Sequence, residues 1–200
     1  MKNHYPSLIL IWIFLLGSSV FVYGLTAING CSDLASISTN DINADYYLNA
    51  SISCPNFTPI GAYSGNPFRG TLDGRGYSLS ITMESSSPHT GLFKYCLNAN
   101  IVNITISDSS LFLISGNFQN HGFLCAYADT TTFSYIRVYN SVMNTSESGT
   151  FASMGLVAGY CGVNSQLDHI TIENSQILCN TANCESTGGI AGSIFISNFF

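Results

Sequence analysis

Charged side chains are scarce in this sequence of 200 residues. Asp, Glu, Lys and Arg together make up 8% of it, against roughly 25% in an average soluble domain. Only five residues are basic and the formal net charge is -6, so the chain lacks the positive surface that binds the phosphates of nucleic acids. Hydrophobic residues nevertheless reach 46%, which argues against disorder and indicates a packed core.

The signatures of common enzymes and metal sites are also missing. The sequence contains no HExxH, GxSxG or Walker motif. It contains no CxxC pair, and the interval from Cys179 to Cys184 is too wide for a zinc knuckle. We therefore predict no catalytic residue, no metal site and no cofactor. The sequence leaves enzyme activity open and favours its absence.

Long amphipathic helices are the third absence. Beyond residue 24, no segment repeats apolar residues at spacings of three and four over ten or more positions. One short helix is expected over 34–42, with Ser32 or Asp33 as its cap. Ser, Thr and Asn supply most of the polarity instead, and these residues suit strands better than helices.

Residues 1–24 have the features of a signal peptide. Lys2 gives a positive start, the run from Leu8 to Leu16 carries no charge, and Gly24 ends the segment with a small residue. We predict a helix that is cleaved on secretion. The alternative is a retained anchor, because the apolar stretch approaches the roughly 17–25 residues that span a bilayer. Contact with a membrane is expected only through this segment, if it is uncleaved, or through sequence beyond residue 200.

Seven cysteines agree with export, because an oxidising compartment permits disulfides. Two pairs lie close in sequence and are the expected bridges: Cys31 with Cys54, and Cys179 with Cys184. The other three are expected to be buried thiols: Cys96, Cys125 and Cys161. The odd number leaves at least one cysteine outside any pair within the chain.

Four Asn-x-Ser/Thr triplets are candidate glycosylation sites: Asn49, Asn56, Asn103 and Asn144. Asn144 is expected in a polar loop and is the best candidate. Asn103 falls within a strand pattern, which favours a structural role.

Glycine-led apolar segments recur every 31 to 34 residues, starting at Gly91, Gly122, Gly155 and Gly189. An alternating strand follows each of the first three: Ile104-Thr105-Ile106, Ile136-Arg137-Val138 and Ile170-Thr171-Ile172. Two independent markers thus keep one period. A strand pair of this size cannot bury its apolar face alone, so the repeats predict stacked coils around one continuous core.

We therefore predict an all-β, parallel β-solenoid over residues 68–200. Ile104 and Ile106 should face the interior and Thr105 the outside, and each repeated glycine should mark a close approach of backbones. The tight turn at Asp73-Gly74 opens the solenoid. Residues 25–67 are expected to form a short N-terminal cap. The fourth repeat stops without its alternating strand, which predicts a fragment of a longer array.

The ordered series of motifs resembles the GLUG-type repeat family of surface and secreted proteins. The opening matches at Leu34, Tyr47, Leu48, Ile52 and Pro59-Ile60-Gly61. The middle matches at Phe68, Gly70, Leu72, Asp73, Gly74, Gly76 and Leu79. The repeat matches at Gly91-Leu92-Phe93, Ile101, Asn103 and Ile104. The resemblance implies a right-handed parallel β-helix outside the cell or on its surface, and it implies no reaction. Lys94 and the number of cysteines depart from the family pattern.

Two classes of function remain. A polysaccharide-active lyase or glycoside hydrolase needs clustered carboxylates, and the candidates Asp73, Asp108, Asp129 and Asp168 lie in turns or loops of the predicted coils. A non-catalytic adhesion, coat or binding module needs only a suitable outer face. Tyrosines with amide neighbours suit a carbohydrate or another surface protein, unless they pack between coils: Tyr127, Tyr135, Tyr139 and Tyr160. The second class is the favoured prediction.

Overall fold

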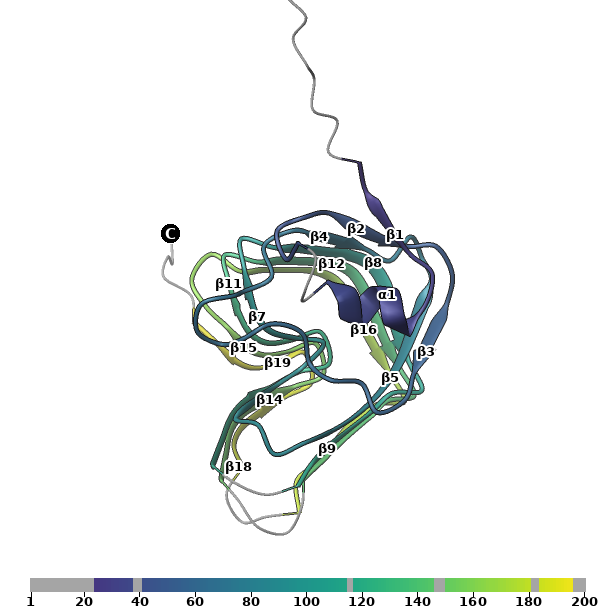
Figure 1. The fold of residues 1–200 in the computed structure, drawn as a ribbon. Coiled ribbons are helices and arrows are strands. Elements are labelled where there is room, and N and C mark those ends of the chain that lie inside the picture. The colour runs from purple at the N-terminus through teal and green to yellow at the C-terminus, as the bar shows by residue number, and fades with distance from the viewer. Residues whose placement is uncertain (1–23, 38–40, 115–116, 146–149, 181–183, 196–200) are drawn as a thin grey trace, which may run out of the picture.

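The computed structural model describes residues 24–37, 41–114, 117–145, 150–180 and 184–195. These residues form an all-β solenoid of parallel strands, as the repeats predict. Viewed along the solenoid axis, successive coils superimpose around one interior (Figure 1). The predicted signal peptide lies outside the described residues, apart from Gly24. None of the helices in the described ranges is long and apolar enough to cross a membrane.

The first elements of the chain cover one end of the solenoid. They are β1 (Thr26–Ile28), α1 (Cys31–Ser36), β2 (Tyr46–Leu48), β3 (Ile52–Cys54), β4 (Thr71–Asp73) and β5 (Ser78–Ser85). Strand β1 pairs with β2, β2 with β4 and β3 with β5, all in parallel. Helix α1 lies across the end of the coils (Figure 1), and the side chains of Leu34 and Ile37 are fully buried there.

The helix begins and ends earlier than the expected range of 34–42. Gly30 is its N-cap residue and provides no side-chain cap, so the prediction of Ser32 or Asp33 in that role is wrong. Asp33 lies within the first turn, and its carboxylate accepts a hydrogen bond from the backbone N–H of Asn29 at 2.9 Å. A carboxylate near a helix N-terminus is favourable because it offsets the helix dipole.

Four faces make up each full coil. The strands of the first coil are β6 (His89–Thr90), β7 (Phe93–Leu97), β8 (Asn100–Ser107) and β9 (Ser110–Leu113). Those of the second are β10 (Asn117–His121), β11 (Cys125–Asp129), β12 (Thr132–Tyr139) and β13 (Val142–Thr145). Those of the third are β14 (Thr150–Gly155), β15 (Ala158–Cys161), β16 (Gln166–Glu173) and β17 (Gln176–Leu178). The last strands are β18 (Cys184–Gly188) and β19 (Ala191–Ile194).

The repeated isoleucines lie in one column, as predicted. Ile104 pairs in register with Ile136, and Ile136 with Ile170. The first two are 1% exposed, and Ile170 is half-buried against the same core. Each buried side chain of this size contributes about 1.5–3 kcal/mol to folding. The shared interior of successive coils is therefore the main source of stability.

The repeated glycines lie where two neighbouring coils approach most closely. A Cβ atom on Gly91 would stand 2.5 Å from the carbonyl oxygen of Gly122 in the next coil. Gly91, Gly122 and Gly155 all have negative φ, so the need for glycine here is one of space and not of backbone angle. The prediction of close backbone approach is confirmed for these three glycines and is wrong for Gly189, where an added Cβ atom would meet nothing within 4 Å.

Residues in the left-handed conformation turn the chain at the same place in each coil. Three columns repeat: Asn98, Thr130 and Asn164; Asn103, Tyr135 and His169; Asp108, Asn140 and Asn174. Asn and Asp tolerate positive φ better than most residues, which explains why they predominate. Asn103 lies within β8, as expected, and its φ of 55° bends that strand. The Asp73-Gly74 turn is likewise a corner between β4 and β5, which both pair with β8.

A column of buried serines satisfies the backbone at one corner. The hydroxyl of Ser141 accepts a hydrogen bond from the N–H of Ser109 at 3.2 Å, and that of Ser175 accepts one from Ser141 at 3.0 Å. Ser109 and Ser141 are 3% and 0% exposed. Buried backbone groups without a partner are costly, so these hydroxyls fix the register of the corner.

Three disulfides link six of the seven cysteines. Cys31 is joined to Cys54, and Cys179 to Cys184, with Cα–Cα distances of 5.5 and 6.5 Å. The prediction of buried thiols is wrong for Cys96 and Cys125, which form a third disulfide with a Cα–Cα distance of 6.4 Å. Their separation of 29 residues is close to one coil, so stacking brings them together. Cys161 is a free, buried thiol, as predicted.

Candidate functional site

Two sheets of the solenoid meet at an inner angle (Figure 1), and a row of tyrosines lies along one of them. One sheet is β6-β10-β14-β18 and the other is β7-β11-β15-β19. Tyr95, Tyr127 and Tyr160 pair in register across β7, β11 and β15. Their ring centroids are 5.2 Å apart for Tyr95 and Tyr127, in an edge contact, and 4.7 Å apart for Tyr127 and Tyr160, which are stacked. We call these three residues the tyrosine row.

Alternation along the strands turns the tyrosine row outward. The residue after each tyrosine is fully or almost fully buried: Cys96, Ala128 and Cys161. Successive side chains of a strand point to opposite faces, so each tyrosine projects away from the core. All three are half-buried. The tyrosines thus combine both interpretations of the sequence, because they stack coil on coil and still contribute to the outer surface.

A buried polar row runs beside the tyrosines on the other sheet. His89 pairs in register with Asn120, and Asn120 with Ser153; they are 5%, 8% and 6% exposed. Asn120 Nδ2 lies 3.4 Å from His89 Nδ1. The Ser153 hydroxyl lies 2.8 Å from that of Ser193 on β19, so a hydrogen bond joins the two sheets across the inner angle.

Tyr63 adds to the aromatic surface beside the first two rings of the row. It lies in the loop between β3 and β4, where Ala62 and Asn66 form an antiparallel bridge. Its ring stacks on His89 at a centroid distance of 3.8 Å. The centroids of Tyr95 and Tyr127 lie 5.9 and 5.6 Å away. The loop therefore places a fourth phenol ring beside the tyrosine row.

Burial favours the uncharged forms of Tyr95, Tyr127 and His89. Burial, followed by the neighbouring Tyr160 and Asp129, raises the pKa of Tyr127 to about 12. Burial and Asp129 also raise the pKa of Tyr95. The pKa of His89 is lowered by burial and then by the positive charge of Lys94. The surface therefore presents neutral groups that donate and accept hydrogen bonds.

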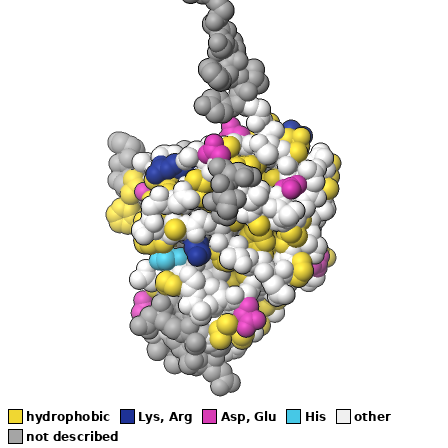
Figure 2. Space-filling model, in the orientation of Figure 1, with side chains coloured by type: hydrophobic (Ala, Val, Ile, Leu, Met, Phe, Trp, Pro, Cys, Tyr) yellow, Lys and Arg dark blue, Asp and Glu magenta, His cyan; other side chains and the backbone are white. Residues whose placement is uncertain are grey.

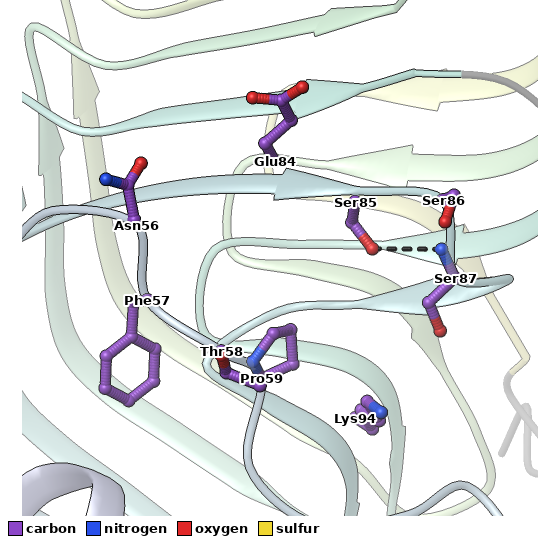
Figure 3. A pocket seen from close by; sticks show the side chains of 9 residues that line it. All are labelled: Asn56, Phe57, Thr58, Pro59, Glu84, Ser85, Ser86, Ser87 and Lys94. Atoms are coloured by element: carbon purple, nitrogen blue, oxygen red, sulfur yellow. Dashed lines mark hydrogen bonds between the residues drawn. The ribbon is translucent and has the colours of Figure 1, made fainter.

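A cavity of roughly 350 Å³ adjoins this surface at Lys94, which precedes Tyr95 on β7. It is lined by Asn56, Phe57, Thr58, Pro59, Glu84, Ser85, Ser86, Ser87 and Lys94. Figure 3 shows Glu84 and Lys94 on different sides of it, and the Ser85 hydroxyl accepting a hydrogen bond from the Ser87 N–H. Glu84 is the single acidic side chain among these nine. The cavity thus lacks the second carboxylate that glycoside hydrolysis normally uses.

The four aspartates considered for catalysis are engaged at corners or loops of the coils. Asp73 accepts hydrogen bonds from the Arg75 N–H and from Asn103 Nδ2, at 2.8 and 3.2 Å. Asp108 accepts one from Asn140. The Asp129 carboxylate accepts a hydrogen bond from the Thr130 hydroxyl at 3.5 Å, and the Asp168 carboxylate lies 2.7 Å from His169 Nδ1. Each contact is with a neighbour in sequence or in the adjacent coil, which is a structural role.

The other two tyrosines considered in the sequence lie on a different face. Tyr135 on β12 is 58% exposed and stacks on His169 at 4.6 Å. Tyr139, at the end of β12, is half-buried, with the Arg137 guanidinium 5.1 Å from its ring centroid. Arg137 itself faces outward and forms an ion pair with Glu173, at 2.6 Å. Neither tyrosine belongs to the tyrosine row.

The four candidate glycosylation sites lie at the surface to different extents. Asn49, Asn56 and Asn103 are exposed, although Asn103 Nδ2 donates to Asp73. Asn144 lies in strand β13 and not in the expected loop, and it is half-buried. Its Oδ1 accepts a hydrogen bond from Asn180 Nδ2 at 2.7 Å, so the preference for Asn144 has no support from its position.

Sequence reasoning missed Tyr63, His89 and Tyr95 at this site. Tyr95 had a signal, because tyrosines follow Gly91, Gly122 and Gly155 at offsets of four or five residues. Tyr63 had none, since the loop that carries it has no counterpart in the repeats. His89 had none because its row contains three different residue types, His89, Asn120 and Ser153.

No family model, curated protein or solved structure matches this chain. The repeat architecture itself is established by the parallel strands and their register. Together, the solenoid fold and the disulfides fit an extracellular module.

Proposed function

We propose that this chain is a secreted or cell-surface β-solenoid module without catalytic activity, which binds a ligand through the tyrosine row and Tyr63. The observation that carries the proposal is the in-register stack of Tyr95, Tyr127 and Tyr160 on the outside of three successive coils. Aromatic side chains that pair a large apolar ring with a hydroxyl are enriched at binding surfaces.

The wider surroundings support binding more than catalysis. The aspartates at Asp73, Asp108 and Asp168 are held by neighbouring side chains or backbone groups. On the end of the solenoid that faces the viewer in Figure 2, charged side chains are scattered among polar and apolar ones. At the tyrosine row, a carbohydrate or another surface protein would meet hydroxyls, amides and rings, and little net charge.

Secretion, glycosylation and kinship with GLUG-type repeats are parts of the same proposal. The signal-like segment 1–24, the four Asn-x-Ser/Thr triplets and the ordered glycine and isoleucine motifs support them. Three disulfides support an oxidising compartment.

Adhesion of the labelled, disulfide-bonded chain to the surface of the cells that produce it tests the proposal. The double variant Tyr95→Ala, Tyr127→Ala should lose at least ten-fold in bound protein, whereas Tyr135→Ala, an exposed aromatic on another face, should match the wild type. Equal binding by the double variant and the wild type would contradict the proposal.

A further inference from the structure

The aromatic surface has a shape that fits an extended ligand. Neighbouring coils repeat every 4.7–4.9 Å, and the tyrosine row carries one ring per coil along the axis. Tyr63 lies beside the first two rings of the row, 5.9 Å from Tyr95 and 5.6 Å from Tyr127, and stacks on His89. At the C-terminal end, Ser193 takes the place of a tyrosine in register with Tyr160. The row is therefore a strip of defined length, open along the direction in which the coils stack.

The groups on this strip match the chemistry of sugars. A sugar ring carries apolar C–H faces and hydroxyls that both donate and accept hydrogen bonds. The strip offers ring carbons together with protonated phenol hydroxyls, since the pKa of Tyr127 is raised to about 12 and that of Tyr95 is also raised. The rings are held in place by packing on one another at 5.2 and 4.7 Å, and His89 of the neighbouring polar row stacks on Tyr63.

The fixed charges near the strip are few and of both signs. Asp129 influences Tyr95 and Tyr127, Arg69 influences Tyr95, and Lys94 influences His89. An anionic polysaccharide would need a cluster of basic side chains, and a cationic partner would need several carboxylates. The balance favours a ligand without charge.

A peptide that binds by adding a strand is not suited to this surface. Strand β11 is hydrogen-bonded to β7 on one side and β15 on the other, and β15 is bonded to β11 and β19. The outer side of β7 is hydrogen-bonded to Ile60 and Phe68. The strip therefore offers no open strand edge, which β-strand addition requires. Recognition has to come from side chains, and these are the rings and hydroxyls described above.

We infer that the tyrosine row and Tyr63 bind a neutral glycan chain that lies along the solenoid axis. This inference rests on the proposed function and names its ligand class. The parts of the rings that stacking leaves uncovered, which are the outward edges where Tyr127 stacks on Tyr160, contact the apolar faces of successive sugars. The phenol hydroxyls exchange hydrogen bonds with the sugar hydroxyls.

Calorimetric titration of the full disulfide-bonded chain tests the inference. The probes are the hexasaccharides of β-1,4-glucose, β-1,4-xylose, β-1,4-mannose and β-1,3-glucose, with a galacturonate hexasaccharide as the anionic comparison. At least one neutral probe should bind, and the galacturonate should bind at least ten-fold more weakly. Tyr127→Ala should weaken the neutral interaction at least ten-fold, Tyr127→Phe less than Tyr127→Ala, and Tyr135→Ala not at all. Thermal unfolding of each variant shows whether it is folded.

Two results would overturn the inference. In the first, the folded wild-type chain binds none of the neutral probes, although its adhesion to cells depends on Tyr95 and Tyr127. The proposed function then stands, and the ligand belongs to another class, such as a protein. The other is binding of a neutral probe that Tyr127→Ala leaves unchanged and Tyr135→Ala abolishes. If adhesion to cells is also insensitive to the tyrosines, the proposed function fails together with its ligand.

Discussion

Gly122 faces Ala158 of the next coil so closely that a Cβ atom on Gly122 would stand 2.6 Å from the Ala158 Cα. The Ala158 Cα is a backbone atom within a packed stack, so it cannot move aside without shifting a coil. The glycine repeat is thus a consequence of how closely the coils pass each other at the inner angle. In each of the three coils, the tyrosine of the row follows the glycine by four or five residues.

Replacing Gly122 with alanine should lower the free energy of unfolding by about 1–3 kcal/mol, because inserted methyl groups in a packed interior force backbone shifts. Chemical denaturation measures the change. Gly189→Ala is the matched control, since it lies in the same repeated segment with nothing within 4 Å of its added Cβ. Equal effects of the two substitutions would show that close approach is not the reason for the repeat.

Replacing Ser141 with alanine should cost about 1–3 kcal/mol, the usual penalty for leaving a buried polar group without its partner. The lost hydroxyl accepts from the Ser109 N–H and donates to the Tyr139 carbonyl, at 3.2 and 2.9 Å. Urea denaturation gives the value. Ser110→Ala, an exposed serine of β9, should change stability by less than about 0.5 kcal/mol, and a larger loss there would argue against a special role for the buried column.

The stability should fall as the pH drops below about 6.5. Burial, followed by the neighbouring His89, lowers the pKa of His121 to about 3, whereas an unfolded histidine titrates near 6.5. Between these values the unfolded chain binds a proton that the folded chain does not, so the linkage favours unfolding by up to about 1.4 kcal/mol per pH unit. Above pH 6.5 both states are neutral and the effect vanishes.

Denaturation at pH 7 and pH 5 measures this dependence, and His121→Gln should reduce the difference between them. An unchanged pH dependence in His121→Gln would contradict the assignment to this residue.

Thiol titration of the chain made through a secretory route should find one reactive cysteine, and only after unfolding. The reason is that six cysteines are bridged and Cys161 is buried, with a pKa raised by burial to about 12. Removal of the Cys31–Cys54 bridge by Cys31→Ala, Cys54→Ala should cost about 2–4 kcal/mol. Three reactive thiols in the unfolded wild type would show that one bridge does not form.

The sequence allowed the core to be predicted better than the site. Ile104, Ile136 and Ile170 keep one period and one alternation, so their shared interior followed from spacing alone. The tyrosine row followed the same period, yet its surface depends on the contact of Tyr63 with His89, and no repeat relates these two residues. The Cys96–Cys125 bridge was missed for a similar reason, because it requires knowing how far one coil advances along the axis.

The disulfides also determine how the molecule would respond to a pulling force. Each coil is hydrogen-bonded only to its neighbours, so coils can peel away one after another under tension. Cys31–Cys54 ties the start of α1 to the end of β3, and Cys96–Cys125 ties β7 to β11. Extension would therefore separate the coils beyond β11 first and meet covalent resistance at these two bridges, because Cys179–Cys184, with a sequence separation of 5, closes only a short segment.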